Sequence, residues 1–386
     1  MKRNSVVFFI GVCFILHGCK QSPVSTVDLH VIDLDQSSFP KCIEDNYNEF
    51  VRYIPLETNK DVLIEQSSRL VYFSEERIIM INNRQGDVFV FDGNGKILSF
   101  FNRMGSGPEE YKKLLSSEVI YDPFNREIFV MEREHCHVYS ENGNYLRDLL
   151  YPRRKEYTEA YSFDKETLLV FDANTLTDSA FVLISKKDGK ILSCINLHLK
   201  NRISNQLVVS REGNRVNIRI GVQKQQLIKD GENFILAEIS SDTIYKFTKD
   251  RQLIPLLTRK PSVHEYGDNN PFKVFQPIKV TDKIIFGFFY KQNLLNPERP
   301  ESFSLLYDLD KHQPFDFSSS MEEDFIGGFS SRERTDLPAN LFVLRNFPDL
   351  ILERIEDGKL QGQKIKELAK NLKDEDNPVI QVIRFK

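Results

Sequence analysis

The sequence predicts an all-β protein, a six-bladed β-propeller, and three observations support this fold class. A unit of strand, tight turn and strand recurs along the chain. The turn glycines Gly95, Gly143 and Gly189 lie 48 and 46 residues apart, which is close to the repeat length of propeller blades. Phe (30 residues) and Tyr (14 residues) are abundant, and aromatic side chains favour strands.

The recurring unit is a β-hairpin that occurs in five copies. Its turns contain Gly, Asn or Asp, which tolerate the positive φ of tight hairpin turns. The five hairpins are residues 88–98, 137–146, 181–192, 243–254 and 304–312. An apolar strand precedes each hairpin, at residues 77–81, 127–131, 167–171, 233–237 and 283–287. Such nearly continuous apolar strands suit sheets that are covered on both faces, as stacked blades are.

A sixth blade requires the two ends of the chain. Residues 50–56 are expected to form an early strand and residues 378–384 the last strand. Pairing these strands in one blade would close the ring without an exposed sheet edge. Spacing of i, i+3, i+4 and i+7 predicts one C-terminal helix, with Ile365, Leu368, Ala369 and Leu372 on its apolar face. A β-sandwich, or a propeller of five or seven blades, is the alternative fold.

The first residues have the features of an export signal. A positively charged start precedes an apolar run over residues 6–16, far shorter than the roughly 20 residues of a membrane-spanning helix. Residues 16–19 read Leu-His-Gly-Cys and resemble the bacterial lipobox, although His17 replaces the usual small or hydroxyl residue. The resemblance implies cleavage before Cys19 and lipid attachment to it. An ordinary secretory signal with an incidental cysteine is the alternative.

The chain divides into three predicted regions. Residues 1–18 form the signal peptide, 19–47 a tether and entry segment, and 48–386 the propeller. Removal of the signal lowers the formal net charge from −4 to −6, because Lys2 and Arg3 are its only charges. This mildly acidic composition argues against a nucleic-acid partner.

Three further cysteines remain in the predicted mature chain. Cys42, Cys136 and Cys194 are too few and too widely spaced for a disulfide framework. Buried structural thiols are therefore expected, with one disulfide as the alternative.

Three short segments resemble a known family. Residues 53–58 (YIPLET) resemble the opening strand of the six-bladed β-propeller lipoproteins of Gram-negative gut-type bacteria. Residues 105–111 (GSGPEEY) resemble a loop of that family after the first full hairpin. Residues 375–379 (EDNPV) resemble the approach to its closing strand. Together with the lipobox, the resemblance covers nearly the whole chain. It implies the fold and export but no reaction for any residue. At family level it suggests capture or sensing of nutrients such as glycans.

The 105–111 loop supplies most of the candidate binding residues. Its two glycines and its proline imply a fixed backbone path that directs Glu110 and Tyr111 towards a neighbour. The candidate binding residues are Arg103, Glu109, Glu110, Tyr111 and Tyr290. The structural alternative is a connection between blades, held by packing of Tyr111 and by hydrogen bonds from backbone amides to Glu110. Tyr290 ends an aromatic run that also suits a buried strand.

No motif in the sequence identifies a reaction. Strand alternation places His135 and His137 on one face, but a zinc site needs further ligands and the sequence identifies no partner cluster. No Gly-x-Ser-x-Gly motif occurs, and the remaining histidines are scattered. We therefore predict no catalytic residue, no metal and no cofactor.

The sequence favours a binding or interaction lipoprotein of the outer membrane over an enzyme. The lipid on Cys19 would hold it at the membrane, and its ligand, a carbohydrate or a protein, would bind at one face of the ring. The competing interpretation is a hydrolase or lyase that acts on a polymer at the central channel. A scaffold subunit of an envelope complex is a third interpretation.

Overall fold

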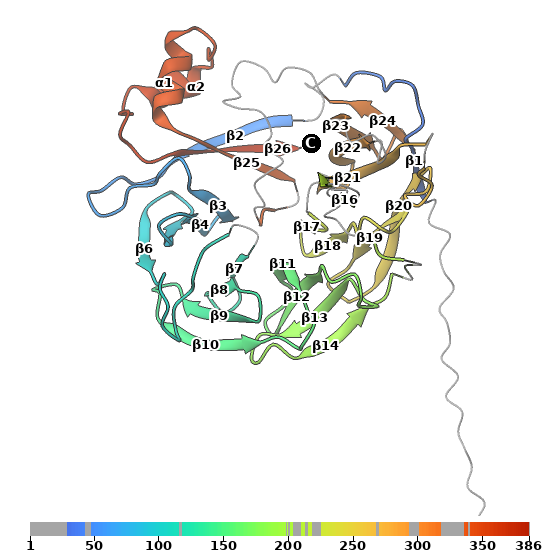
Figure 1. The fold of residues 1–386 in the computed structure, drawn as a ribbon. Coiled ribbons are helices and arrows are strands. Elements are labelled where there is room, and N and C mark those ends of the chain that lie inside the picture. The colour runs from blue at the N-terminus through green and yellow to red at the C-terminus, as the bar shows by residue number, and fades with distance from the viewer. Residues whose placement is uncertain are drawn as a thin grey trace, which may run out of the picture.

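Six β-sheets surround a central axis as the blades of a propeller (Figure 1). The computed structural model describes residues 29–42, 48–115, 118–197, 199, 201–203, 210–212, 215–217, 225–267, 270–292, 301–317, 336–338 and 340–385. The predicted all-β, six-bladed fold is confirmed. The predicted signal peptide and Cys19 lie outside the described residues. Among those residues, neither helix has the length and apolar character needed to cross a membrane.

Blades one to three are four-stranded antiparallel sheets whose strands follow one another in sequence. From the inner to the outer edge, blade one contains β3 (Arg69–Phe73), β4 (Arg77–Asn82), β5 (Asp87–Asp92) and β6 (Ile97–Asn102). Blade two contains β7 (Val119–Asp122), β8 (Glu127–Met131), β9 (His135–Ser140) and β10 (Tyr145–Leu150). Blade three contains β11 (Tyr157–Ser162), β12 (Thr167–Asp172), β13 (Phe181–Ser185) and β14 (Ile191–Ile195).

Blades four and five follow the same order, and blade four carries an additional strand. Blade four contains β17 (Leu227–Asp230), β18 (Asn233–Leu236), β19 (Thr243–Phe247) and β20 (Leu253–Lys260). Blade five contains β21 (Phe272–Val280), β22 (Ile284–Gln292), β23 (Glu301–Asp308) and β24 (Gln313–Asp316). Strand β1 (His30–Asp33) pairs parallel to β20. Part of the predicted tether and entry segment therefore packs on the ring.

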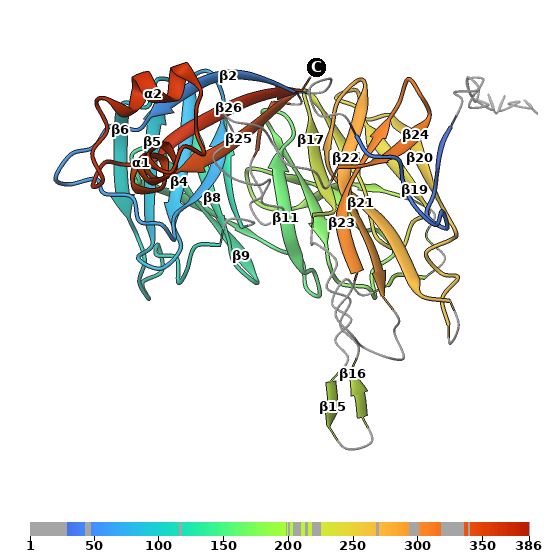
Figure 2. The same ribbon diagram turned by 90° about the horizontal axis from the view of Figure 1, so that it is seen from above.

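One small hairpin stands apart from the blades. It consists of β15 (Ser210–Glu212) and β16 (Arg215–Asn217), and it projects from one face of the ring (Figure 2).

Blade six combines strands from opposite ends of the chain. Its order is β2 (Asn48–Pro55), β26 (Val379–Phe385) and β25 (Leu341–Asn346), all antiparallel. The buried side chain of Asn377 links the segments before and after these strands. Its amide donates to the carbonyl oxygens of Glu57 (2.8 Å) and Val62 (2.9 Å) and accepts from the amide of Ile64 (2.8 Å). Two of the segments that resemble the lipoprotein family thus meet at this blade.

Two helices, and not the single predicted one, lie between β25 and β26. Helix α2 (Gln363–Ala369) corresponds to the prediction, whereas α1 (Pro348–Glu356) was missed. Helix α1 begins with a proline and has Asp349 in its first turn, both typical of a helix start. Its apolar residues do not repeat over several turns, so periodicity alone did not identify it.

The first four predicted hairpins form the third and fourth strands of blades one to four, and the fifth covers β23 and the turn before β24. The apolar strand before each hairpin is the second strand of its blade. The turn residues Gly95, Gly143 and Gly189 have φ values of 87°, 75° and 77°. In the two less regular copies, Arg251 (φ 62°) and His312 (φ 53°) are the left-handed turn residues. The left-handed turn therefore persists where the glycine signal is lost.

Successive side chains of each central strand pack alternately against the blade on one side and the blade on the other. In β4, Ile79 and Ile81 belong to the cluster shared with blade two, and Ile78 and Met80 to the cluster shared with blade six. Similar clusters fill the remaining four interfaces between adjacent blades. The hydrophobic core is therefore a ring of interfaces between sheets.

Turn glycines approach the outer strand of the preceding blade. A Cβ atom at Gly95 would lie 2.3 Å from the carbonyl oxygen of Pro55, and one at Gly189 would lie 2.6 Å from that of Leu150. At Gly143 the neighbour is the side chain of Phe101. A side chain at these positions is disfavoured by the positive φ and would also clash with the adjacent blade.

We predict that Gly95→Ala lowers the free energy of unfolding by about 3 kcal/mol, because it adds a clash between blades to an unfavourable φ. The control is Gly231→Ala, which also has positive φ (61°), but among the described residues no atom beyond its chain neighbours lies within 4 Å of the added Cβ. This substitution should cost about 1 kcal/mol. Urea unfolding of the two variants measures the difference. Equal losses would contradict a role of Gly95 in blade packing.

Candidate functional site

Tyr111 of the candidate loop is buried and holds the connection between blades one and two. Its hydroxyl donates to the carbonyl oxygen of Gly86 (2.6 Å) and accepts from the amide of Arg103 (3.0 Å). The side chain is 0% exposed, and burial raises the pKa of its phenol. Tyr111 therefore has no free face for a ligand in this structure.

The other loop candidates surround the same connection. The Glu110 carboxylate accepts from the amide of Gly107 (2.8 Å). Arg103 Nε donates to the carbonyl oxygen of Gly143 in blade two (2.9 Å). The backbone carbonyl of Glu109 accepts from the hydroxyl of a blade-two tyrosine (2.8 Å). The loop thus links two blades, and among its four candidate residues only Arg103 and Glu109 have exposed side chains.

Tyr290 does not join this group. It lies in β22 of blade five, where its ring is 7% exposed and packs near Phe288, with ring centroids 6.2 Å apart. The five candidates therefore do not converge on one site.

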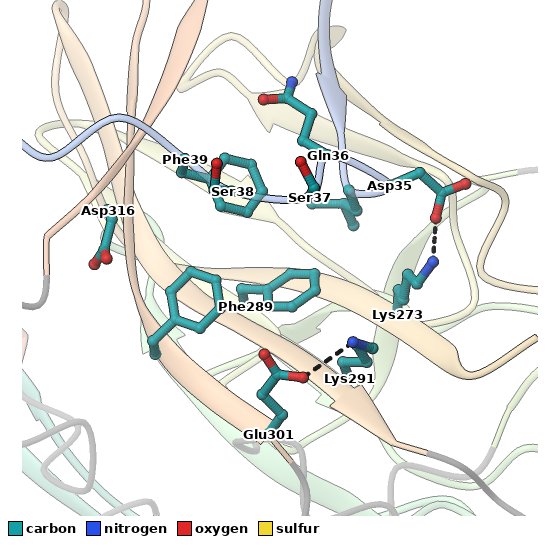
Figure 3. Close-up of a pocket in the computed structure, with 12 residues that line it drawn as sticks. Asp35, Gln36, Ser37, Ser38, Phe39, Lys273, Phe289, Lys291, Glu301 and Asp316 are labelled. Carbon is teal, nitrogen blue, oxygen red and sulfur yellow. Dashed lines mark hydrogen bonds and ion pairs between the residues drawn. The ribbon is translucent and has the colours of Figure 1, made fainter.

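A pocket of about 360 Å³ lies elsewhere, between residues 34–39 and blade five (Figure 3). We call residues 34–39 the strap. At one end, the amide of Leu34 donates to the carbonyl oxygen of Lys260 in blade four (2.6 Å). Just beyond the other end, Pro40 and Cys42 form backbone hydrogen bonds with Asp316 of β24 (2.8 and 2.9 Å). The strap therefore crosses from blade four to blade five and forms one wall of the pocket.

Three phenylalanine rings form the apolar side of the pocket. Phe39 belongs to the strap, Phe289 to β22 and Phe303 to β23. The ring centroids of Phe289 and Phe303 are 5.0 Å apart, and Phe39 lies 6.1 and 5.9 Å from them. This aromatic cluster continues the hydrophobic core between blades four and five to the pocket.

Charged and hydroxyl groups form the rim. Asp35 of the strap forms an ion pair with Lys273, and Lys291 Nζ lies 3.1 Å from Glu301 Oε2 (Figure 3). Asp316 and the strap residues Gln36, Ser37 and Ser38 complete the polar lining. Its volume lies in the range of small-molecule sites, and eight of its twelve lining residues are polar or charged.

Sequence reasoning did not identify this pocket. Its wall comes from the predicted tether and entry segment, and its floor from strands more than 200 residues further along the chain. The aromatic run in β22 was visible, but no local pattern indicates which segment packs against it.

A family profile matches residues 29–384 of this chain. The chain belongs to the DUF4934 family. That family is described as a domain of unknown function. The comparison supports a family of uncharacterised propellers, in agreement with the fold implied by the sequence resemblance.

Solved structures similar to this DUF4934 protein include a Bacteroides fragilis protein described as exported, with a TM-score of 0.61 and 15% identity over 93% of this chain and 99% of that one. A DUF4221-family protein from Bacteroides vulgatus has a TM-score of 0.44 and 11% identity, covering 88% of this chain and 99% of its own. The WD40 domain of Neurospora crassa Pan2 has a TM-score of 0.36 and 10% identity, covering 72% and 75%. The first similarity supports the fold alone. No curated protein matches the chain.

The DUF4934 ring also carries a buried charge cluster at its inner edge. Asp336 pairs through its backbone with β3, and its carboxylate lies 2.8 Å from Lys229 Nζ of β17. Lys279 of β21 donates to the carbonyl oxygen of Pro338 (2.5 Å). Burial raises the pKa of Tyr72, and Asp336 raises it further. The Asp336 carboxylate is thus paired with a cation and lies beside a phenol.

The three cysteines of the described residues have different environments. Cys42 and Cys136 are buried, as predicted, and burial raises the pKa of the Cys136 thiol. Cys194 is exposed, which corrects the expectation of a buried thiol. It lies on β14, the outer strand of blade three, which has one face towards solvent.

We predict a pH-dependent contribution of Lys279 to stability. Burial lowers its pKa to about 7 in the folded protein, whereas an unfolded lysine titrates near 10.4. Between these values the unfolded chain binds more protons, so the free energy of unfolding rises with pH. From pH 7 to pH 9, the wild type should gain roughly 2 kcal/mol relative to Lys279→Met.

Urea unfolding at several pH values measures this difference. Lys283→Met, at an exposed lysine of the same blade, is the control and should show a constant difference from the wild type. A constant difference for Lys279→Met as well would contradict the prediction.

Proposed function

We propose that this protein is an outer-membrane lipoprotein that binds a carbohydrate in the strap pocket. The observation that carries the proposal is the combination of an aromatic floor and a polar rim in a pocket of about 360 Å³. The propeller fold supports a general binding or interaction role, and the pocket supports the choice of ligand.

The chemistry of the pocket suits a sugar. The C–H face of a sugar ring packs on aromatic rings, and its hydroxyls require several donors and acceptors at the edge. The rim supplies both kinds of group, because two acidic residues are paired with two lysines. With two ion pairs and one further acid, Asp316, the rim carries little net charge and favours a neutral polar ligand over a strongly charged one.

The beginning of the chain supports a membrane anchor. The lipobox ends at Cys19 and the first described strand starts at His30, so a short tether separates the predicted lipid from the ring. β1 lies on the outer edge of blade four (Figure 1), next to the strap. The Bacteroides fragilis protein of similar fold is described as exported, which agrees with a location in the cell envelope.

A screen of neutral oligosaccharides by thermal shift tests the binding proposal, because a ligand of the folded state raises the melting temperature. For a saccharide that binds, Phe303→Ala and Lys291→Ala should each weaken binding about 10-fold in calorimetric titration, through loss of ring contact and of a hydrogen bond. Phe124→Ala removes an exposed aromatic ring of blade two and should leave the affinity unchanged.

Two results would overturn this proposal. One is a screen in which no saccharide shifts the melting temperature. The other is saccharide binding that both pocket variants retain at full affinity.

We predict that Cys19→Ser abolishes lipidation and moves the protein from the membrane fraction to the soluble envelope fraction. Stable anchoring depends on acyl chains, each buried CH₂ contributing about 0.8 kcal/mol. Mass spectrometry of the mature N-terminus and membrane fractionation measure the effect, with Cys42→Ser as the matched control. A wild-type protein with an uncut signal, or with an unmodified N-terminus beyond Cys19, would exclude the anchor.

A further inference from the structure

Blade two carries a group of side chains with the chemistry of a metal site. Glu132 lies in the turn from β8 to β9, and His135 and His137 lie on β9. Asp148 lies opposite His137 on β10. We call these four residues the histidine cluster. It lies on a different blade from the strap pocket and is independent of the proposed carbohydrate site.

The potential ligand atoms already lie at suitable distances. The Nε2 atoms of His135 and His137 are 3.0 Å apart, and His135 Nε2 is 3.6 Å from Glu132 Oε2. All three ligand atoms lie within 4.8 Å of one another. Ligands bound to tetrahedral zinc at about 2.0–2.2 Å are roughly 3.3 Å apart. Only small side-chain movements are therefore needed to bind an ion.

Hydrogen bonds orient two of the three ligands. His137 Nδ1 lies 2.6 Å from Asp148 Oδ1, so its proton is held there and its Nε2 lone pair is directed towards His135. This carboxylate–histidine pairing is typical of zinc ligands. Glu132 Oε1 accepts from the backbone amide of Lys112 (2.8 Å), which leaves Oε2 facing His135. One orienting group, the Asp148 carboxylate, lies on β10, and the other, the Lys112 amide, lies in the connection between β6 and β7.

The burial of the cluster suits an ion with one open coordination position. The side chains of His137 and Glu132 are 4% and 10% exposed, whereas that of His135 is 28% exposed. Solvent therefore reaches the cluster from the His135 side. Two carboxylates also balance the charge of a divalent cation in this partly buried place.

We propose that the histidine cluster binds a divalent transition-metal ion of the zinc class. Glu132, His135 and His137 are the protein ligands, Asp148 positions His137, and a water molecule completes the tetrahedron. The bound ion fixes the β8–β9 turn against the connection that contains Lys112. The sequence pattern is Glu-x-x-His-x-His, in which the acidic residue precedes the strand that carries the two histidines.

Isothermal titration of the purified, metal-free and untagged protein with ZnCl₂ tests the proposal. We expect one Zn²⁺ per chain with a dissociation constant in the micromolar range or tighter, and a rise in melting temperature on binding. His135→Ala and Glu132→Gln, at partly exposed positions, should each weaken binding at least 10-fold. Asp148→Asn should weaken it about 10- to 100-fold through loss of ligand orientation.

His264→Ala is the matched control, because it removes a histidine of the described fold outside the cluster. It should leave the stoichiometry and the affinity for Zn²⁺ unchanged. Circular dichroism of each variant confirms that the propeller is folded. Absence of Zn²⁺ binding at millimolar concentration, or unchanged affinity in both His135→Ala and Glu132→Gln, would overturn the proposal.

Discussion

The structure depends on the burial of both faces of every blade by its neighbours. Within a strand such as β4, successive apolar side chains point to opposite faces, so a single strand contributes to two interfaces. Each sheet lacks an independent core, because its two apolar faces become stable only when the adjacent blades cover them. The close approach of Gly95 and Gly189 to the preceding blade shows how little space remains at the edges of these interfaces.

The requirement for a closed ring explains the unusual composition of blade six. Pairing of β2 with β26 brings residues from both ends of the chain together. Asn377 is placed where three backbone groups near the start of the ring need partners. A buried backbone polar group without a partner is costly. By bonding to these three groups, the side-chain amide of Asn377 stabilises the contact between the segment after β2 and the segment before β26.

The same connections that stabilise the ring support the two candidate sites. The strap is fixed by backbone hydrogen bonds at blades four and five, and its position creates the wall of the pocket. The loop that ends at Tyr111 leads directly to Lys112, whose amide orients Glu132 in the histidine cluster. A motif that serves packing between blades one and two thus also positions a potential metal ligand.

The sequence by itself determined the elements that local pattern encodes. Alternation and apolar runs identified the second strands, and turn residues with positive φ identified the hairpins, because both signals come from neighbouring residues. The same reasoning placed the strap in a tether and entry segment without a binding role, missed α1 and left His135 and His137 without a third ligand. Only the tertiary structure decided these points. The strap pocket depends on contacts between residues more than 200 positions apart. The orientation of Glu132 depends on the backbone amide of Lys112, in the connection between blades one and two. Such contacts join segments that are separated in the sequence, and no local periodicity records them.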